Sequence, residues 1–376
     1  MVNRKNLLTR FAGWLLSVSL IFTLVVPCLM PSASANNAVY ENVYKIHDMI
    51  GYADEYTDYE GDHNPSYRFY DKDCTNFVSQ CISVAGGIPQ EGYFAADSKG
   101  KPYCHPWTVP ADLFYYLTQE KGYNSSSFSC GYSINREKNE ASVWVSGNVK
   151  ISVGDVVFFD FGSGIQHAAV IVGYNSSGVP CYAGHTNNRW MHPLWDAAVD
   201  HGYSCTTSCT YYIVHMTDTA GLTDVTSRYI GKKDAIKVAI KSIEVGQYVS
   251  SDTDQNVDTV DAVANRNTAS TWEYFDVIAN KYGGIGFKSH ANGNYLSSRI
   301  DLNSTSAPVR AAYGQNYTEP QSWESFRIYE KDGIQYIQSQ ANGKWVQVIV
   351  NESSHPVKAG ARAASTWEQF SIEVIG

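Results

Sequence analysis

Hydrophobic and polar positions follow a helical period in the first third of the chain. Apolar residues recur every three or four positions over 38–57 and again over 74–85, which predicts two amphipathic helices. The Gly-Gly pair at 86–87 supplies the stop signal of the second helix. A third helix is predicted at about 109–120, with Pro110 in its first turn.

After about residue 150 the period of the pattern changes to two. Short segments rich in Val, Ile, Phe and Tyr predict strands at 156–161, 167–174, 179–184 and 211–216. The stretch 175–178 reads as a turn between two of them. Helices followed by an antiparallel sheet are typical of an α+β domain.

The last third of the chain contains an internal threefold repeat. Its three series are Trp-Glu-x-Phe, Gly-x-aromatic and a single alanine, and each recurs about every 47 residues. They lie at 272–275, 323–326 and 367–370, at 246–248, 293–295 and 343–345, and at Ala264, Ala311 and Ala359. Three repeats rich in short strands predict a β-trefoil, since most propellers need more repeats. A β-sandwich with chance similarity is the alternative.

The N-terminus has the pattern of a secretory signal. Three basic residues precede an apolar run at 11–26, and the small residues at 33–35 form an A-x-A cleavage site. An uncleaved anchor is the alternative. We therefore expect an exported, extracellular protein, which could stay associated with the cell wall.

These patterns divide the chain into four parts. We expect a signal peptide at 1–35, a hydrolase-like domain at 36–216, a polar linker at 217–235 and the trefoil at 236–376. No stable membrane insertion is expected once the signal is cleaved.

Charge narrows the range of partners. Removing the signal segment, with its three basic residues, changes the formal charge from −9 to −12. An acidic chain lacks the basic footprint that nucleic-acid binding requires. Attachment to polyanionic walls or membranes would therefore have to be specific.

Seven cysteines remain after cleavage, all before residue 210. An odd count in an exported protein suggests one free thiol, while the other six could form up to three disulfides in pairings that stay open. A zinc site at His201, Cys205 and Cys209 is a weak alternative, because no second Cys pair has finger spacing. No metal or organic cofactor is expected.

The strongest chemical candidate is Cys74, at the predicted start of a helix. Asp73 is a good N-cap residue, which places Cys74 in the first helical turn. The positive end of the helix dipole favours thiolate over thiol, so we expect the pKa of Cys74 to be lowered. A thiolate attacks carbonyl carbon, and the backbone N–H of Cys74 could face the resulting oxyanion.

A histidine should serve as its base. His167 opens an apolar strand, and the small side chains of Ala168 and Ala169 beside it leave space for a substrate. A further polar group should hold the other imidazole nitrogen and fix its tautomer. We expect His185 in that role, with Asn187 and Asn188 as alternatives.

Three motifs together carry a family resemblance: Asp73–Phe77, Gly154–Phe159 and His167–Gly173. Over about 40–216 the chain resembles the putative amidase domain family, a branch of the NlpC-type, papain-like cysteine hydrolases. The resemblance implies a nucleophile at Cys74, a base at His167 and an orienting residue at His185.

Supporting positions follow from the same region. The segment Asn64–Tyr67 also matches the amidase pattern, so Tyr67 is a candidate to support the substrate. Arg189 could pair with a substrate carboxylate, although a surface ion pair is an equally simple role. Cys81, two turns after Cys74, is expected to be a core or disulfide residue.

The repeats resemble a fascin-like β-trefoil. They lack the Q-x-W signature of ricin-type lectins, so Trp-Glu-x-Phe is interpreted as trefoil core. We expect an exported cysteine hydrolase that cleaves an amide bond, first of all in peptidoglycan, with a trefoil that could bind a glycan. A non-catalytic wall- or carbohydrate-binding adhesion protein is the main alternative. An amidase acting on a peptide, a conjugate or a host protein is a further one.

Overall fold

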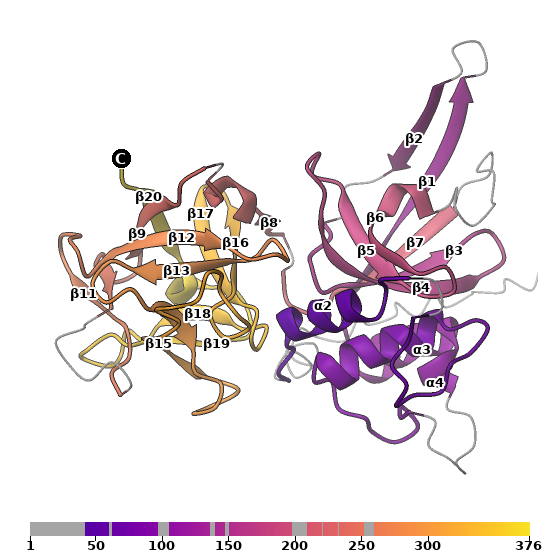
Figure 1. Cartoon of the computed structure of the whole chain (residues 1–376), viewed down its shortest axis with the longest axis horizontal. Helices are drawn as coiled ribbons and strands as arrows, with labels where there is room; N and C mark the ends of the chain where they lie inside the picture. The colour runs from indigo at the N-terminus through magenta and orange to yellow at the C-terminus, as the bar shows by residue number, and fades with distance from the viewer. Residues whose placement is uncertain are drawn as a thin grey trace, which may run out of the picture.

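The structure is a computed structural model, and it shows a mostly β chain with few helices. Two separate sheets form two units that lie side by side, with the C-terminal unit drawn in orange and yellow (Figure 1). The described residues are 42–59, 62–96, 105–135, 140–146, 150–197, 209–219, 221–231, 233–251 and 259–376. The expected signal peptide at 1–35 lies outside them. Within these ranges, no helix is long and apolar enough to cross a bilayer.

The helices precede the first sheet and match two of the three predictions closely. The helix predicted at 74–85 is α3 (Cys74–Ser79) continued by the π-helix η1 (Gln80–Ala85), and the one at 109–120 is α5 (Pro110–Tyr115) continued by η2 (Tyr116–Glu120). A short helix α4 (His105–Thr108) was not predicted.

The first helix begins later than predicted, because α2 covers only Ile46–Glu55. Just before it, the backbone N–H of Tyr44 donates to the carbonyl of Asn342 in the C-terminal unit. The backbone N–H of His47 likewise donates to the carbonyl of Gln340. These bonds between the units hold the start of α2 against the second sheet.

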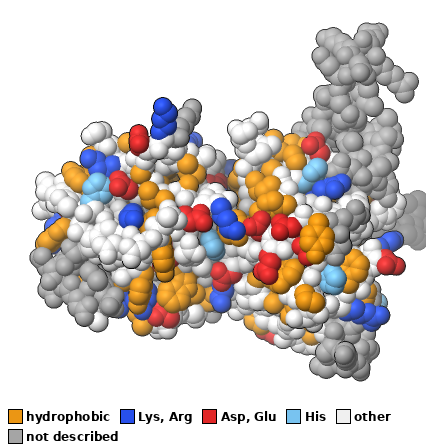
Figure 2. Space-filling view, viewed as in Figure 1, with side chains coloured by type: hydrophobic (Ala, Val, Ile, Leu, Met, Phe, Trp, Pro, Cys, Tyr) orange, Lys and Arg blue, Asp and Glu red, His pale blue; other side chains and the backbone are white. Residues whose placement is uncertain are grey.

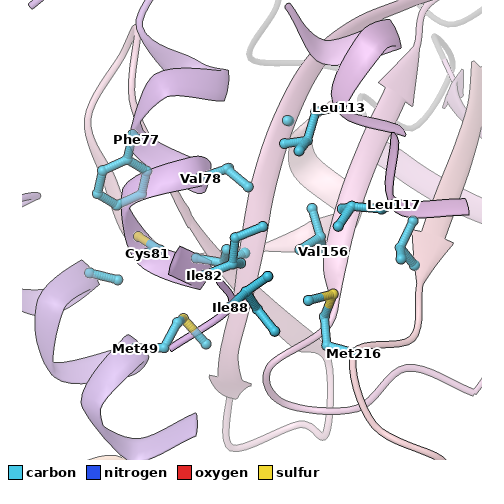
Figure 3. Close-up of a cluster of buried hydrophobic side chains, with 14 of the residues drawn as sticks. Met49, Phe77, Val78, Cys81, Ile82, Ile88, Leu113, Leu117, Val156 and Met216 are labelled. Carbon is cyan, nitrogen blue, oxygen red and sulfur yellow. The ribbon is translucent and has the colours of Figure 1, made fainter. Parts of the chain in front are cut away.

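The α3–η1 segment is almost entirely buried. Phe77, Val78 and Cys81 have no measurable exposure, and Figure 3 shows Val78 on the side of the helix that faces α5–η2 and strand β3. Gly87 ends the segment with φ of +85°, a left-handed conformation in which a side chain would be strained.

The first sheet has seven antiparallel strands in the order β2-β1-β7-β3-β4-β5-β6. The strands are β1 (Ser125–Asn135), β2 (Glu140–Ser146), β3 (Val156–Asp160), β4 (Ile165–Tyr174), β5 (Pro180–Gly184), β6 (Arg189–Pro193) and β7 (Cys209–Val214). Strands β3, β4, β5 and β7 were predicted; β1, β2 and β6 were not. Residues of β4 alternate between the two faces, with Ala168 and Val170 in the core under the helices and Ala169 and Ile171 in the core of the opposite face.

Twelve strands of the described second unit form three groups of four. They are β9 (Ile236–Ser242), β10 (Tyr248–Ser250), β11 (Val263–Arg266), β12 (Tyr274–Ala279), β13 (Ile285–Ser289), β14 (Tyr295–Ser298), β15 (Ala307–Tyr313), β16 (Phe326–Lys331), β17 (Ile334–Ser339), β18 (Trp345–Val348), β19 (Val357–Ala361) and β20 (Phe370–Val374). Strands β9, β12, β13, β16, β17 and β20 pair in a closed ring. The hairpins β10–β11, β14–β15 and β18–β19 complete a β-trefoil.

The sequence repeats correspond to this threefold architecture. Gly246, Gly293 and Gly343 take nearly equal φ values of +72°, +73° and +70° in equivalent turns. In each Trp-Glu-x-Phe motif the Glu and Phe are buried, but the Trp is only half-buried and lies outside the central cluster. The interpretation as core was therefore wrong for the three tryptophans.

The stretch predicted as a polar linker contains structure of its own. Strand β8 (Thr223–Asp224) pairs with β16, and the 3-10 helix η4 (Thr226–Tyr229) follows it. Val225 and Tyr229 are buried in the trefoil core. Much of 217–235 thus packs as part of the second unit.

Candidate functional site

Cys74 is the first residue of α3 and lies against the beginning of β4. The backbone N–H groups of Ala168 and Thr75 face its sulfur and act to lower its pKa. The Thr75 hydroxyl lies 3.7 Å from the same sulfur. Ala168 directly follows His167 in β4, so the strand backbone, and not the His167 ring, is what faces the sulfur.

Asp73 occupies the N-cap position, but its carboxylate does not cap the helix. One oxygen, Oδ2, lies 2.8 Å from Nδ1 of His185. The other, Oδ1, accepts hydrogen bonds from the side chain of Asn76 and the backbone N–H of Tyr70. The expected capping interaction is therefore replaced by a buried polar network.

His185 lies on the helix side of the sheet, just after β5. Its Nε2 lies 2.7 Å from the carbonyl oxygen of Tyr56, and its ring stacks on Phe77 at 3.9 Å. The two ring nitrogens thus face the Asp73 carboxylate and the Tyr56 carbonyl oxygen. His185 therefore anchors Asp73, and the expectation that it orients His167 is not met.

His167 lies on the opposite face of β4 from Ala168. It pairs across the strands with Phe159, and the two rings are 5.4 Å apart. Only 6% of its surface is exposed, and 5% of that of Cys74. The small neighbours Ala168 and Ala169 are fully buried, so they pack in the two cores and leave no open space for a substrate.

Burial shifts the pKa of Cys74 and that of His167. Burial raises the pKa of Cys74, and the charge of Asp73 adds to that effect, although the Ala168 and Thr75 donors act in the opposite direction. Burial lowers the pKa of His167 to about 4. The expected lowering of the Cys74 pKa was wrong, because desolvation outweighs the helix N-terminus. The resting state therefore holds a thiol and a neutral imidazole.

The N-terminal part of the chain matches a known family model and a bacterial protein. Residues 43–214 match the family model described as "Putative amidase domain". The match covers α2 to β7 and includes Cys74, His167 and His185. The uncharacterized protein YhbB of Bacillus subtilis (strain 168) is 27% identical over 161 residues, which span 41% of this chain and 45% of that protein. We call residues 43–214 the amidase-like unit.

Several solved structures match part of the chain. The designed threefold protein ThreeFoil matches with a TM-score of 0.33 at 12% identity, covering 37% of this chain and 99% of its own. The BEL β-trefoil matches with a TM-score of 0.32 at 16% identity, covering 38% and 94%. The Rhizoctonia solani agglutinin matches with a TM-score of 0.32 at 9% identity, covering 39% and 99%.

The predicted supporting residues of the amidase-like unit are not gathered at one point. Tyr67 is half-buried and stacks on Trp107 at 6.5 Å. Asn187 is exposed in the turn after His185, and Arg189 begins β6 opposite Gly184.

Asn76 and Trp107, which were not predicted from the sequence, hold the start of α3 in place. Asn76 donates to Asp73 and to the carbonyl of Arg68, and its own carbonyl accepts from the indole N–H of Trp107. The signal available in the sequence was the spacing Asp73-x-x-Asn76, which places both side chains on one helix face.

The cysteines are mostly core residues. Cys74, Cys81 and Cys181 carry buried free thiols, so at least two of the six expected disulfide partners are unpaired. The register of β1 and β7 places Cys130 opposite Cys209, both in the core. The zinc alternative depends on His201 and Cys205, which lie outside the described residues. Within the described part, no group of three or more His, Cys, Asp or Glu could hold a metal ion.

Proposed function

We propose that the protein is an exported amide hydrolase in which Cys74 is the nucleophile and His167 the general base. The single observation that carries the proposal is the contact of the Cys74 sulfur with the N–H of Ala168, within the segment that matches the amidase family. The finer assignment to NlpC-type, papain-like hydrolases rests on the motif resemblance and on helices packed against an antiparallel sheet.

The buried thiol and imidazole determine the form of the first step. The proposal requires the His167 ring, which lies against Phe159 on the other face of β4, to turn toward the sulfur. Neutral His167 then takes the thiol proton as the sulfur of Cys74 bonds to the substrate carbonyl carbon. The backbone N–H groups of Ala168 and Thr75 stabilise the anionic sulfur during this transfer. The carbon–nitrogen bond then breaks, the amine leaves with the proton from His167, and an acyl thioester remains on Cys74.

The second step returns the enzyme to its resting state. His167 accepts a proton from water, whose oxygen attacks the thioester carbonyl. The carbon–sulfur bond breaks, the acid product leaves, and the proton passes back to the sulfur. Asp73, His185 and Asn76 hold the start of α3 and thereby fix the position of Cys74.

Peptidoglycan is the proposed substrate, since an exported hydrolase of amide bonds meets it first. The fascin-like trefoil would attach the enzyme to a glycan or a protein surface, a role that rests on fold analogy. Export rests on the signal pattern at 1–35.

Wall digestion tests the proposal. Purified walls are incubated with the wild type, Cys74→Ala, His167→Ala and the control Cys81→Ala, and released stem peptides are quantified by mass spectrometry. We expect peptide release to fall about 1,000-fold or more in the first two variants. The control should change little, because the Cys81 thiol lies in the hydrophobic core. Wall digestion that survives Cys74→Ala contradicts the nucleophile assignment.

One observation favours a second candidate, a non-catalytic glycan- or wall-binding protein. Cys74 and His167 are nearly enclosed, and burial shifts the pKa of each away from a thiolate–imidazolium pair. This candidate predicts that wild type and Cys74→Ala bind walls equally and that neither releases peptides.

A further inference from the structure

A large hollow lies between the two units, and Cys74 is not among the residues that line it. It is a cleft of about 880 Å³, within the range of small-molecule sites. One wall is the β4–β5 turn and β6 of the amidase-like unit. The other is β8, η4 and the β12–β13 turn of the trefoil. Figure 2 shows acidic, basic and hydrophobic side chains meeting along this junction on the viewed face.

The two walls contribute aromatic side chains that face each other. Trp190 from β6 and Tyr282 from the β12–β13 turn lie edge to face, with ring centres 6.4 Å apart. Both are half-buried, so part of each ring remains accessible. Trp195 also lines the cleft and packs its ring against Phe128. Flat aromatic faces beside polar groups suit the apolar and hydroxylated surfaces of a sugar ring.

The trefoil wall is held rigidly. Tyr282 contacts the ring of His47 at 5.2 Å, and its hydroxyl lies 3.2 Å from Asp54, both on or beside α2. Arg327 donates to the Tyr282 carbonyl and to Asp224, so it ties the β12–β13 turn to β8. A site held this way needs little reordering on binding.

The charge of the lining is opposite to that of the whole chain. Lys150, Lys281 and Arg327 line the cleft against one acidic residue, Asp224, although the chain carries a net charge of −9. Asp224 neutralises Arg327, and Asp54 pairs with Lys281 at 3.0 Å. Lys150 is exposed, and its hydrogen bonds within the described part of the chain go to the uncharged oxygens of Gly221 and Thr223. Its charge is therefore available to an anionic ligand.

We propose that this cleft binds a carbohydrate chain that carries carboxylates, with Trp190 and Tyr282 against the sugar rings and Lys150 at a carboxylate. The identification of that chain with the glycan strand of the wall rests on the proposed function, whereas the cleft and its charge do not. Ala168 and Gly173 are five residues apart on β4, so the cleft lies about 17 Å along the strand from Cys74.

Calorimetric titration of the full chain tests the site. The probes are peptide-stripped glycan strands of peptidoglycan, which carry lactyl carboxylates, an oligogalacturonate, which carries uronic carboxylates, and chitotetraose, which is neutral. We expect the two acidic chains to bind and chitotetraose to bind at least 10-fold more weakly. The proposal is overturned if all three probes bind with equal affinity, or if neither of the two acidic chains binds. Binding of the oligogalacturonate alone supports the site and removes the wall glycan as its ligand.

Variants locate the binding within the molecule. Trp190→Ala and the exposed Lys150→Gln should each weaken binding of the acidic chain at least 5-fold, whereas Tyr282→Phe, which keeps the ring, should leave it within 2-fold. Lys150→Gln changes only an exposed side chain, and unchanged affinity in this variant contradicts the assignment. Cys74→Ala should bind as the wild type does, so a failure of catalysis and a failure of this site give different results.

Discussion

Asp73 Oδ2 and His185 Nδ1 lie 2.8 Å apart, although 112 residues separate them in the chain. Both side chains are at most 3% exposed. The pair joins the start of α3 to the end of β5, directly beside Cys74. It therefore couples the position of the proposed nucleophile to the sheet.

Removing one partner of this pair should destabilise the fold. Asp73→Ala and His185→Ala should each lower the free energy of unfolding by about 3 kcal/mol, because the remaining polar group stays buried without its partner. The double variant should lose clearly less than the sum of the two. Urea denaturation gives these values, with the exposed Asp58→Ala as the control. Strict additivity contradicts a direct interaction.

The pH dependence of stability should reveal the buried His167. Its pKa of about 4 in the folded chain is below the ordinary value near 6.5, so the unfolded chain binds a proton first as pH falls. Stability is then lost between about pH 6.5 and 4, by up to about 3 kcal/mol. His167→Gln should show a smaller loss over this window in urea denaturation at pH 7 and pH 4.5. Identical profiles for both proteins contradict a buried neutral imidazole.

Alkylation of Cys74 should be slow in the resting protein. Because burial raises its pKa and hides the sulfur, iodoacetamide should react at pH 6 no faster than with an ordinary thiol. The rate should climb as pH rises above 8. Peptide mapping identifies the modified residue, and Cys74→Ala provides the blank. A rate already at its plateau at pH 6 would show that the thiolate is preformed.

The trefoil should need residues that the sequence assigned to a linker. Leu222, Val225 and Tyr229 are buried against the trefoil strands. A fragment of residues 221–376 should therefore be more stable than one of 236–376, by roughly 5 kcal/mol for three buried apolar side chains. Thermal denaturation followed by circular dichroism compares the two. Equal midpoints contradict the assignment of β8 and η4 to the trefoil.

Hydrophobic spacing and turn residues predicted much of this fold because both depend on the conformation of a short stretch of chain. The apolar core residues of α3–η1 and α5–η2 recur at helical spacing, and Gly87 ends the first of these segments with a positive φ. The threefold series could be read because Ala264, Ala311 and Ala359 fill equivalent core positions.

Long-range relationships could not be read in this way. The bonds of His185 to Asp73 and Tyr56 depend on how a strand end meets two helices, which no local spacing encodes. The direction of the Cys74 pKa depends on how completely the fold encloses the sulfur, and burial outweighed the helix start. The cleft between the units could not be foreseen either, since Trp190 and Tyr282 belong to different units.

The proposed mechanism requires that the sulfur of Cys74 becomes acylated during turnover. Intact-protein mass spectrometry after rapid acid quench of a reaction with a peptide-amide or muropeptide substrate measures this directly. We expect a mass increase equal to the acyl fragment, mapped to the peptide that contains Cys74 and missing in Cys74→Ala. Steady product release by the wild type with no adduct on Cys74, together with equal release by Cys74→Ala, would contradict it.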